Sequence, residues 1–375
     1  MARDLHSVTA SGILPSQELR ALCDQGAIRA QRPWEEAQFQ PASLDLRLGP
    51  VGHRVRASIL PGRGARVMNK MAPHVITAVD LTRPAVLERN CVYLIPLLES
   101  LELPAPLWGV ANPRSTTGRL DIFTRLVADG AEEFDRVPAG YRGPLYVEVV
   151  PRTFPAVVRE GTRLNQIRFI EGQAQTEDEH LSRLGADEPL VYLDADTPGE
   201  AKISGGLLVS INLRETGGSP VVGYRARTNA PAIDLDLAGA YDTREFWDRV
   251  EANDAGTLIL NPGDFYILAS RERVRVPPGH AAEMVAFDPT LGEFRIHYAG
   301  FFDPGFGYGA GDVRGTPAVL EVRAHDVPFL MEHGQVVGRL VYSRLKAVPD
   351  KVYGVDIGSS YQFQTLALSK QFRRA

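Results

Sequence analysis

"LERNCVYLIPLLESLELP", residues 87–104, has a second copy further along the chain in "LNPGDFYILASRERVRVP", residues 260–277. When the two stretches are aligned, Tyr93 meets Tyr266, and every matched pair is separated by 173 residues. A long-range match of this kind is the signature of a repeated structural unit. The sequence therefore indicates that the chain contains two related halves.

A second pair of segments returns to the same offset. "YVEVVPRTFPAVVREG", residues 146–161, aligns with "VLEVRAHDVPFLMEHG", residues 319–334, and Glu148 meets Glu321. The offset changes only between these two pairs of segments, where the loops differ in length. Because chance does not restore one offset on both sides of an insertion, we predict an internal duplication. We expect a first unit over 1–172, a linker over 173–201 and a second unit over 202–375.

Local patterns in both halves predict β-structure. The chain has 35 Gly and 27 Pro, which break it into short apolar runs. Predicted strands are Val92–Pro96, Leu145–Val150, Arg163–Ile170, Ala318–Arg323 and Val336–Ser343. Helices are expected after Ser16, which could cap the segment that Gly26 ends, and over Thr243–Ala252. The fold class is thus mainly β with a few short helices.

Composition excludes several classes of protein. The 375 residues suit two domains, and the net charge of −5 offers no basic field for nucleic acid. No leader-like apolar segment and no run of 18 apolar residues occurs, so we expect a cytoplasmic protein without a membrane partner. Two cysteines are too few for a disulfide scaffold. The eight histidines form none of the zinc deaminase patterns, so we expect no catalytic zinc.

The richest polar stretch is "NPRSTTGRLDIFTRLVADG", residues 112–130. Arg114 and Arg119 frame three hydroxyl side chains, the first two being Ser115 and Thr116. Guanidinium groups and hydroxyls suit a triphosphate, although such a turn can equally be a solvated loop. A second polar signal is Glu148, a carboxylate within an apolar strand. It is either an exposed or ion-paired residue or a general base with a raised pKa.

Together these features resemble one known family. The first half resembles the dCTP deaminases, of the trimeric dUTPase-like superfamily. The resemblance lies in the order of four features: Arg-Ser-x-x-x-Arg, a hairpin, "GYRG" (140–143) and a strand carrying Glu148. The opening segment, which ends in "DLRLG" (45–49), and "LVADG" (126–130) fit as well. The resemblance covers nearly all of the first half. It implies two tandem dUTPase-like β-barrel (β-clip) repeats and a homotrimer, or another homo-oligomer, with sites between subunits.

The resemblance also assigns roles to residues. Glu148 would be the general base, Ser115 and Arg119 would polarise the attacking water, and Ala128 would position the water or the pyrimidine. Arg114, Ser115 and Thr116 would contact the phosphates, with Mg²⁺ bound by the triphosphate instead of by protein ligands. The implied activity is metal-independent hydrolysis of dCTP to dUTP and ammonia.

The second half carries complementary motifs. "HYAGFFDPGFGYG" (297–309) looks like the family's hairpin, so Ala299, Asp303 and Glu321 form a possible second-repeat site. The Arg-Ser motif is replaced by "AFDPTLGEF" (286–294), whose Asp288 would repel a triphosphate. The tail provides further candidates at the family's spacing for closing over the nucleotide, with Lys370 as a substitute for the family's lysine: Tyr353, Tyr361 and Gln364.

Two other functions compete with deamination. A dUTP pyrophosphatase, or an enzyme with both activities, would need an aspartate to activate water, and Asp129, Asp135 and Asp303 are the candidates. A non-catalytic nucleotide-binding protein would bind dCTP without forming a product.

Overall fold

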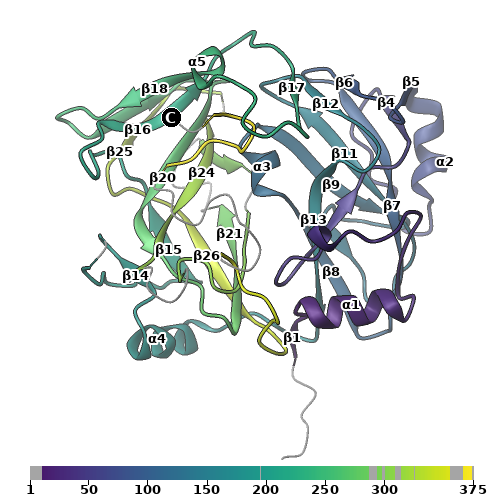
Figure 1. Ribbon diagram of the computed structural model, residues 1–375, viewed down its shortest axis with the longest axis horizontal. Coiled ribbons are helices and arrows are strands. Elements are labelled where there is room, and N and C mark those ends of the chain that lie inside the picture. The colour runs from purple at the N-terminus through teal and green to yellow at the C-terminus, as the bar shows by residue number, and fades with distance from the viewer. Residues whose placement is uncertain are drawn as a thin grey trace, which may run out of the picture.

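Strands dominate both halves of the chain, as the sequence predicts. The computed structural model describes residues 11–194, 196–286, 294–297, 300–308, 314–324, 326–354 and 366–373. Figure 1 shows two β-rich bodies side by side, the first half in purple to blue and the second in teal to yellow. Five of the strands described below contain the five predicted segments.

The first half folds around two sheets. One has the order β1-β13-β8-β10, with β3 also paired to β13; the other has the order β5-β4-β7-β11-β9, with β2 paired to β7. These strands are β1 (Gly12–Ile13), β2 (Ile28–Ala30), β3 (Leu44–Arg47), β4 (Val51–Val55), β5 (Val75–Asp80), β7 (Val92–Glu102), β8 (Leu107–Pro113), β9 (Ile122–Ala128), β10 (Arg136–Val137), β11 (Arg142–Pro151) and β13 (Arg163–Glu171).

The second half repeats this plan. Its sheets have the orders β18-β16-β20-β24-β22, with β14 on β20, and β15-β26-β21-β23, beside the pair β19-β25. These strands are β14 (Val191–Tyr192), β15 (Leu207–Ser210), β16 (Val221–Ala226), β18 (Trp247–Glu251), β19 (Thr257–Leu260), β20 (Phe265–Val274), β21 (His280–Ala286), β22 (Phe294–His297), β23 (Phe301–Phe302), β24 (Thr316–Ala324), β25 (Phe329–Glu332) and β26 (Val336–Arg344).

Strand register carries the duplication into three dimensions. β13 and β26 begin 173 residues apart, and so do β8 and β21. Glu148 lies opposite Leu94 between β11 and β7, and Glu321 lies opposite Ile267 between β24 and β20. Each glutamate therefore occupies the same place in its own half.

The helices are short. They are α1 (Ser16–Asp24), α2 (Val67–Met71), α3 (Ser115–Gly118), α4 (Asp178–Asp187) and α5 (Thr243–Phe246), with 3-10 turns at Glu36–Gln38 and Ala72–His74. Pro15, not Ser16, precedes the first helical residue. The helix predicted over Thr243–Ala252 is wrong beyond Phe246, because the chain then pairs with β16 as β18. Within 173–201, α4 buries Leu181 in the core of the second half.

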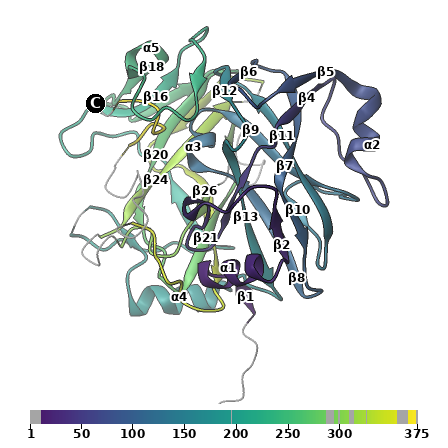
Figure 2. The same cartoon turned by 45° about the vertical axis from the view of Figure 1, so that its right-hand side comes forward.

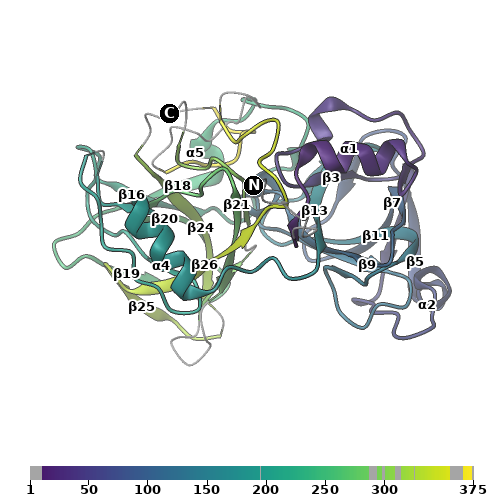
Figure 3. The same cartoon turned by 90° about the horizontal axis from the view of Figure 1, so that it is seen from below.

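An apolar core joins the two halves. Phe154 of the first half packs edge-on against Phe246 and Trp247 of the second, with ring centroids 5.6 and 5.5 Å apart. In addition, β17 (Ile233–Asp234) of the second half pairs with β12 (Ala156–Val158) of the first, which also pairs with β6 (Ala85–Leu87). The view from below separates the halves, with α1 over the first and α4 beside the second (Figure 3). Both other views place α3 at the boundary, near β24 (Figures 1 and 2).

Candidate active site

The second-half carboxylate Glu321 faces the boundary between the halves. Its side chain lies in the middle of β24 and is only 6% exposed. Burial raises the pKa of Glu321 to about 8, and the positive charge of Arg119, from the first half, acts against this shift. The carboxylate of Glu321 thus lies within electrostatic range of a guanidinium group from the other half of the same chain.

Arg119, the residue that follows α3, is held by the C-terminal segment 366–373. Its side chain is 7% exposed, and Nη1 donates to the carbonyl oxygen of Ala367 at 3.1 Å. The hydroxyl of Ser369 donates to the carbonyl oxygen of Thr116 at 3.0 Å. We call residues 114–121, which comprise α3 and its flanking residues between β8 and β9, the α3 loop. Residues 366–373 therefore run beside the α3 loop, and this last described segment of the chain helps to shape the site.

A second charged pair lies next to the first. Arg323 follows Glu321 by two residues, and Asp121 follows Arg119 by two residues, so both pairs connect β24 to the α3 loop. Arg323 donates to Asp121, whose side chain is fully buried and also accepts from the hydroxyl of Thr153 at 2.5 Å. This ion pair joins the two halves two residues away from Glu321 along β24.

The predicted catalytic role of Glu148 stays a prediction, and within the single chain its side chain contacts other groups than the α3 loop. Glu148 is 2% exposed and accepts from the backbone N–H of Ile59 at 3.4 Å. Burial raises its pKa, while hydrogen bonds from Ser58 and Ile59 and the charge of Arg125 lower it. An apolar cluster that includes residues of α2 lies over this side of the first half. The first-half carboxylate therefore lies beside Arg125, because β24 and not β11 faces the α3 loop.

The hairpin of the second half is anchored by a first-half arginine. Arg168 on β13 donates to Asp303 at 3.2 Å and to the carbonyl oxygens of Ala282 and Phe302, each at 3.0 Å. Its guanidinium carbon lies 3.9 Å from the centre of the Phe301 ring. Burial raises the pKa of Asp303, and Arg168 lowers it. Asp303 thus ties the hairpin to the first half.

The other predicted site residues are dispersed. Ala128 is fully buried in the first-half core, opposite Leu145 of β11, and is not brought to the boundary. The ring of Tyr353 packs against Phe306 with centroids 5.3 Å apart, and its N–H donates to the carbonyl oxygen of Pro304. Ala299, Tyr361 and Gln364 lie outside the described residues.

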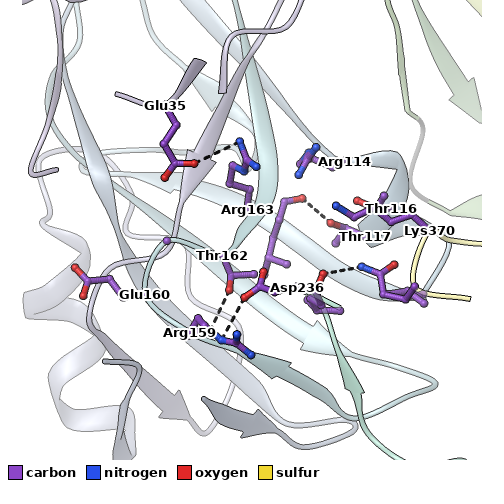
Figure 4. A pocket seen from close by; sticks show the side chains of 15 residues that line it. Glu35, Arg114, Thr116, Thr117, Arg159, Glu160, Thr162, Arg163, Asp236 and Lys370 are labelled. Carbon is purple, nitrogen blue, oxygen red and sulfur yellow. Dashed lines mark hydrogen bonds and ion pairs between the residues drawn. The ribbon is translucent and has the colours of Figure 1, made fainter. Parts of the chain in front are cut away.

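A basic cavity adjoins the α3 loop. It has a volume of about 260 Å³, and its lining includes Arg114, Arg159, Arg163 and Lys370 (Figure 4). The side chains of Thr116, Thr117 and Thr162 add hydroxyls, and Glu35, Glu160 and Asp236 add carboxylates. We name it the α3 cavity. It could accept an anionic group beside the Arg-Ser motif.

Arg114, in the lining of the α3 cavity, is oriented by a buried carboxylate. Its Nε lies 3.2 Å from Oδ2 of Asp45, which is fully buried on β3. Burial raises the pKa of Asp45 to about 6, and Arg114 lowers it. Sequence reasoning missed Arg159 and Arg163. Their signal was the basic pair flanking the turn at Gly161, just before β13.

No group of three His, Cys, Asp or Glu side chains is placed to hold a metal among the described residues. In the same part of the chain, no helix has the length and apolarity required to span a bilayer.

Comparison with known proteins assigns the family. A family model described as the 2'-deoxycytidine 5'-triphosphate deaminase N-terminal domain matches residues 10–173, and the C-terminal domain model matches residues 177–372. The chain belongs to the dCTP deaminase family. The two models meet within the predicted linker.

Individual relatives agree with this assignment. The crystal structure of 2'-deoxycytidine 5'-triphosphate deaminase from Agrobacterium tumefaciens is similar with a TM-score of 0.85 and 49% identity, over 91% of this chain and 99% of that one. A dCTP deaminase of Halorubrum lacusprofundi is 31% identical over 37% of this chain and 64% of its own length. A "dCTP deaminase, dUMP-forming" of Halobacterium salinarum is 30% identical over 37% of this chain and 67% of its own length. The match to the Agrobacterium tumefaciens structure spans both halves of this chain, so that protein also has both halves.

Proposed function

We propose that the chain hydrolyses dCTP at C4 of the cytosine, releasing ammonia, in one composite site between its halves. The observation that carries this proposal is the ion pair between Arg323 and Asp121, which sets β24, the strand of Glu321, against the segment of the first half that carries Arg119. The Arg-Ser motif is found in the first half, and the hairpin that resembles the family's is found in the second half. A single site per chain, built from both halves, would use one motif from each.

The chemistry follows from these two groups. Glu321 takes a proton from water as the water oxygen bonds to C4, and it passes this proton to the ring nitrogen N3, where the proton stays. Glu321 then carries the second proton, from the new C4 hydroxyl, to the amine, so that the C–N bond breaks, ammonia leaves and C4 becomes a carbonyl. Arg119 stabilises the negative charge that develops at the attacked centre. Ser115 is exposed at the start of α3 and can hold the attacking water. We expect Mg²⁺ to bind triphosphate oxygens, with the protein's cations contacting the remaining ones.

The positive side chains of the α3 cavity suggest where the triphosphate binds. Arg114 and Thr116 belong to the α3 loop, and Lys370 lies in the same cavity. Arginine and lysine side chains bind phosphate through charge-assisted hydrogen bonds. We therefore place the phosphates toward the α3 cavity and the base toward Glu321.

The product is a separate question. Relatives such as those of Halobacterium salinarum and Sulfurihydrogenibium sp. carry the name "dCTP deaminase, dUMP-forming", which favours dUMP with pyrophosphate as a second candidate outcome. The aspartates considered for that step have structural partners. Asp129 accepts from the N–H of Val67, and Asp135 from the N–H of Leu126. We favour dUTP as the product.

One assay separates these possibilities. The chain is incubated with dCTP, ammonia is measured by a coupled reaction, and nucleotides and pyrophosphate are separated by ion-exchange chromatography. We expect ammonia and dUTP in equal amounts. Pyrophosphate in equal amount to ammonia would replace dUTP by dUMP as the product. Tight dCTP binding without ammonia would reject the deaminase proposal in favour of a nucleotide-binding protein.

The rate should depend on pH through Glu321. A general base acts in its deprotonated form, and burial raises the pKa of this carboxyl to about 8. We expect kcat/KM for dCTP to rise about tenfold per pH unit below that value and to level off above it. The measurement is a profile of kcat/KM between about pH 6 and about pH 9.5. A profile that falls above pH 8 would assign the essential form to the protonated acid.

Lys370 should affect substrate binding more than turnover. Lys370→Met removes a positive charge from the α3 cavity, and we expect KM for dCTP to rise about tenfold with kcat little changed. Steady-state kinetics measure both constants. Lys202→Met, at an exposed position in the second half, is the matched control. An equal response of the two variants would remove Lys370 from the phosphate site.

The predicted homotrimer stays a prediction. Because β24 contacts the segment that carries Arg119 within one chain, the proposed pairing of Glu321 with Arg119 does not require a neighbouring subunit.

A further inference from the structure

A second basic cavity lies where the halves meet. It has a volume of about 240 Å³ and is lined from the first half by Arg89 and Arg152 and from the second by Arg227, Asp264 and Arg323. We name it the junction cavity. It shares no lining residue with the α3 cavity. The two are therefore separate places for a ligand.

Charge in the junction cavity is strongly positive. Four arginines and one carboxylate, Asp264, are the charged groups of its lining. Arg227 already pairs with Asp248 at 2.8 Å, and Arg323 pairs with Asp121. Arg89 and Arg152 are exposed and form no ion pair with any residue that the structure describes. Two guanidinium groups thus converge on the cavity with their charge uncompensated.

The first-half side of the cavity is rigidly built. The backbone N–H of Arg152 donates to the carbonyl oxygen of Asp121 at 2.9 Å, and the N–H of Asn90 donates to that of Pro151 at 2.7 Å. The turn that carries Arg89 and the bend after β11 that carries Arg152 are therefore hydrogen-bonded into one unit. These backbone bonds fix where the two arginine side chains start, and the planar fork of each guanidinium matches the oxygens of an anion.

Size restricts the occupant. A cavity of about 240 Å³ is smaller than typical sites that enclose a drug-sized ligand, which begin near about 300 Å³. Arginine forks match the oxygens of phosphate in geometry as well as charge. We propose that the junction cavity is a second anion site, which binds a pyrophosphate-like group, either free or as the phosphate chain of a nucleotide.

Such an occupant would lie close to the catalytic pair. Arg323 and Glu321 are two residues apart on β24 and point to the same face of the strand. Asp121, which Arg323 contacts, belongs to the segment that carries Arg119. An anion in the junction cavity would compete with Asp121 for Arg323, so the site is positioned to communicate with the carboxylate that we assign to catalysis.

Inorganic pyrophosphate tests the proposal directly, without turnover. The full chain is titrated calorimetrically, and the double variant Arg89→Glu with Arg152→Glu is compared with wild type. We expect wild type to bind one more equivalent of pyrophosphate than this variant. Arg63→Glu with Arg83→Glu, a charge-matched change at two exposed first-half positions, should behave as wild type. The circular dichroism spectrum and melting temperature of each variant establish that it is folded.

The result has a clear alternative. Equal stoichiometry and affinity in wild type and both double variants would overturn the proposal, whatever the enzyme does with dCTP. Titration with ATP in place of pyrophosphate then distinguishes the source of the group. An extra equivalent with both probes supports a site open to nucleotides, and an extra equivalent with pyrophosphate alone supports a site for the free anion.

Discussion

Glu321→Gln should retain dCTP binding and lose about 10³-fold in kcat. Glutamine keeps the size and one hydrogen-bonding oxygen of the buried glutamate but cannot accept the proton of the attacking water. The change therefore removes general-base catalysis while leaving Arg119 and the α3 cavity in place. Steady-state kinetics give kcat, and calorimetry with dCTP gives the affinity of the inactive variant.

The duplication supplies a matched control. Glu148 occupies the equivalent strand position in the first half and is also buried, but its partners are Ile59, Ser58 and Arg125. We expect Glu148→Gln to keep kcat within about threefold of wild type, as for a residue outside the reacting groups. Loss of activity in Glu148→Gln together with full activity in Glu321→Gln would contradict the composite site.

The second large effect concerns stability. Asp121→Asn should lower the free energy of unfolding by about 3–5 kcal/mol, because it leaves the charge of Arg323 buried without a counter-charge. Asparagine suits this position because Asp121 has φ of 55°, in the left-handed region that asparagine tolerates. Urea unfolding followed by circular dichroism measures the loss.

Two comparisons test the origin of that loss. In Asp121→Asn with Arg323→Met no uncompensated charge is left, and the double variant should be more stable than Asp121→Asn alone. Asp248→Asn breaks the exposed pairs with Arg225 and Arg227 and should cost at most about 1 kcal/mol. An Asp121→Asn variant no less stable than Asp248→Asn would mean that the ion pair between the halves does not hold them together.

Much of the fold was predictable because it depends on local pattern. Alternating apolar residues bounded by Gly and Pro specify strands, and the offset of 173 residues placed Glu148 and Glu321 at equivalent positions. The helix expected over Thr243–Ala252 failed beyond Phe246 because Trp247 is buried in the core between the halves and the following residues pair with β16. Tertiary contacts there override local propensity.

The site was only partly predictable. Arg114, Thr116 and Lys370 were identified from the sequence, and the structure places them in one cavity. The sequence showed that the second half carries motifs complementary to those of the first, but it did not predict a site shared between the two halves. The choice between Glu148 and Glu321 was not visible, because both glutamates lie in similar strands and differ only in what packs against them.

The sequence by itself determined that the chain is a duplicated β-protein and which residue types could bind a nucleotide. Only the tertiary structure decided that the α3 loop of the first half faces β24 of the second, and that α2 and its neighbours lie over the side of Glu148. The physical reason is that strand patterns are set by neighbours along the chain. The environment and pKa of a buried carboxylate are set by the charges and apolar surfaces that folding brings to it from distant segments.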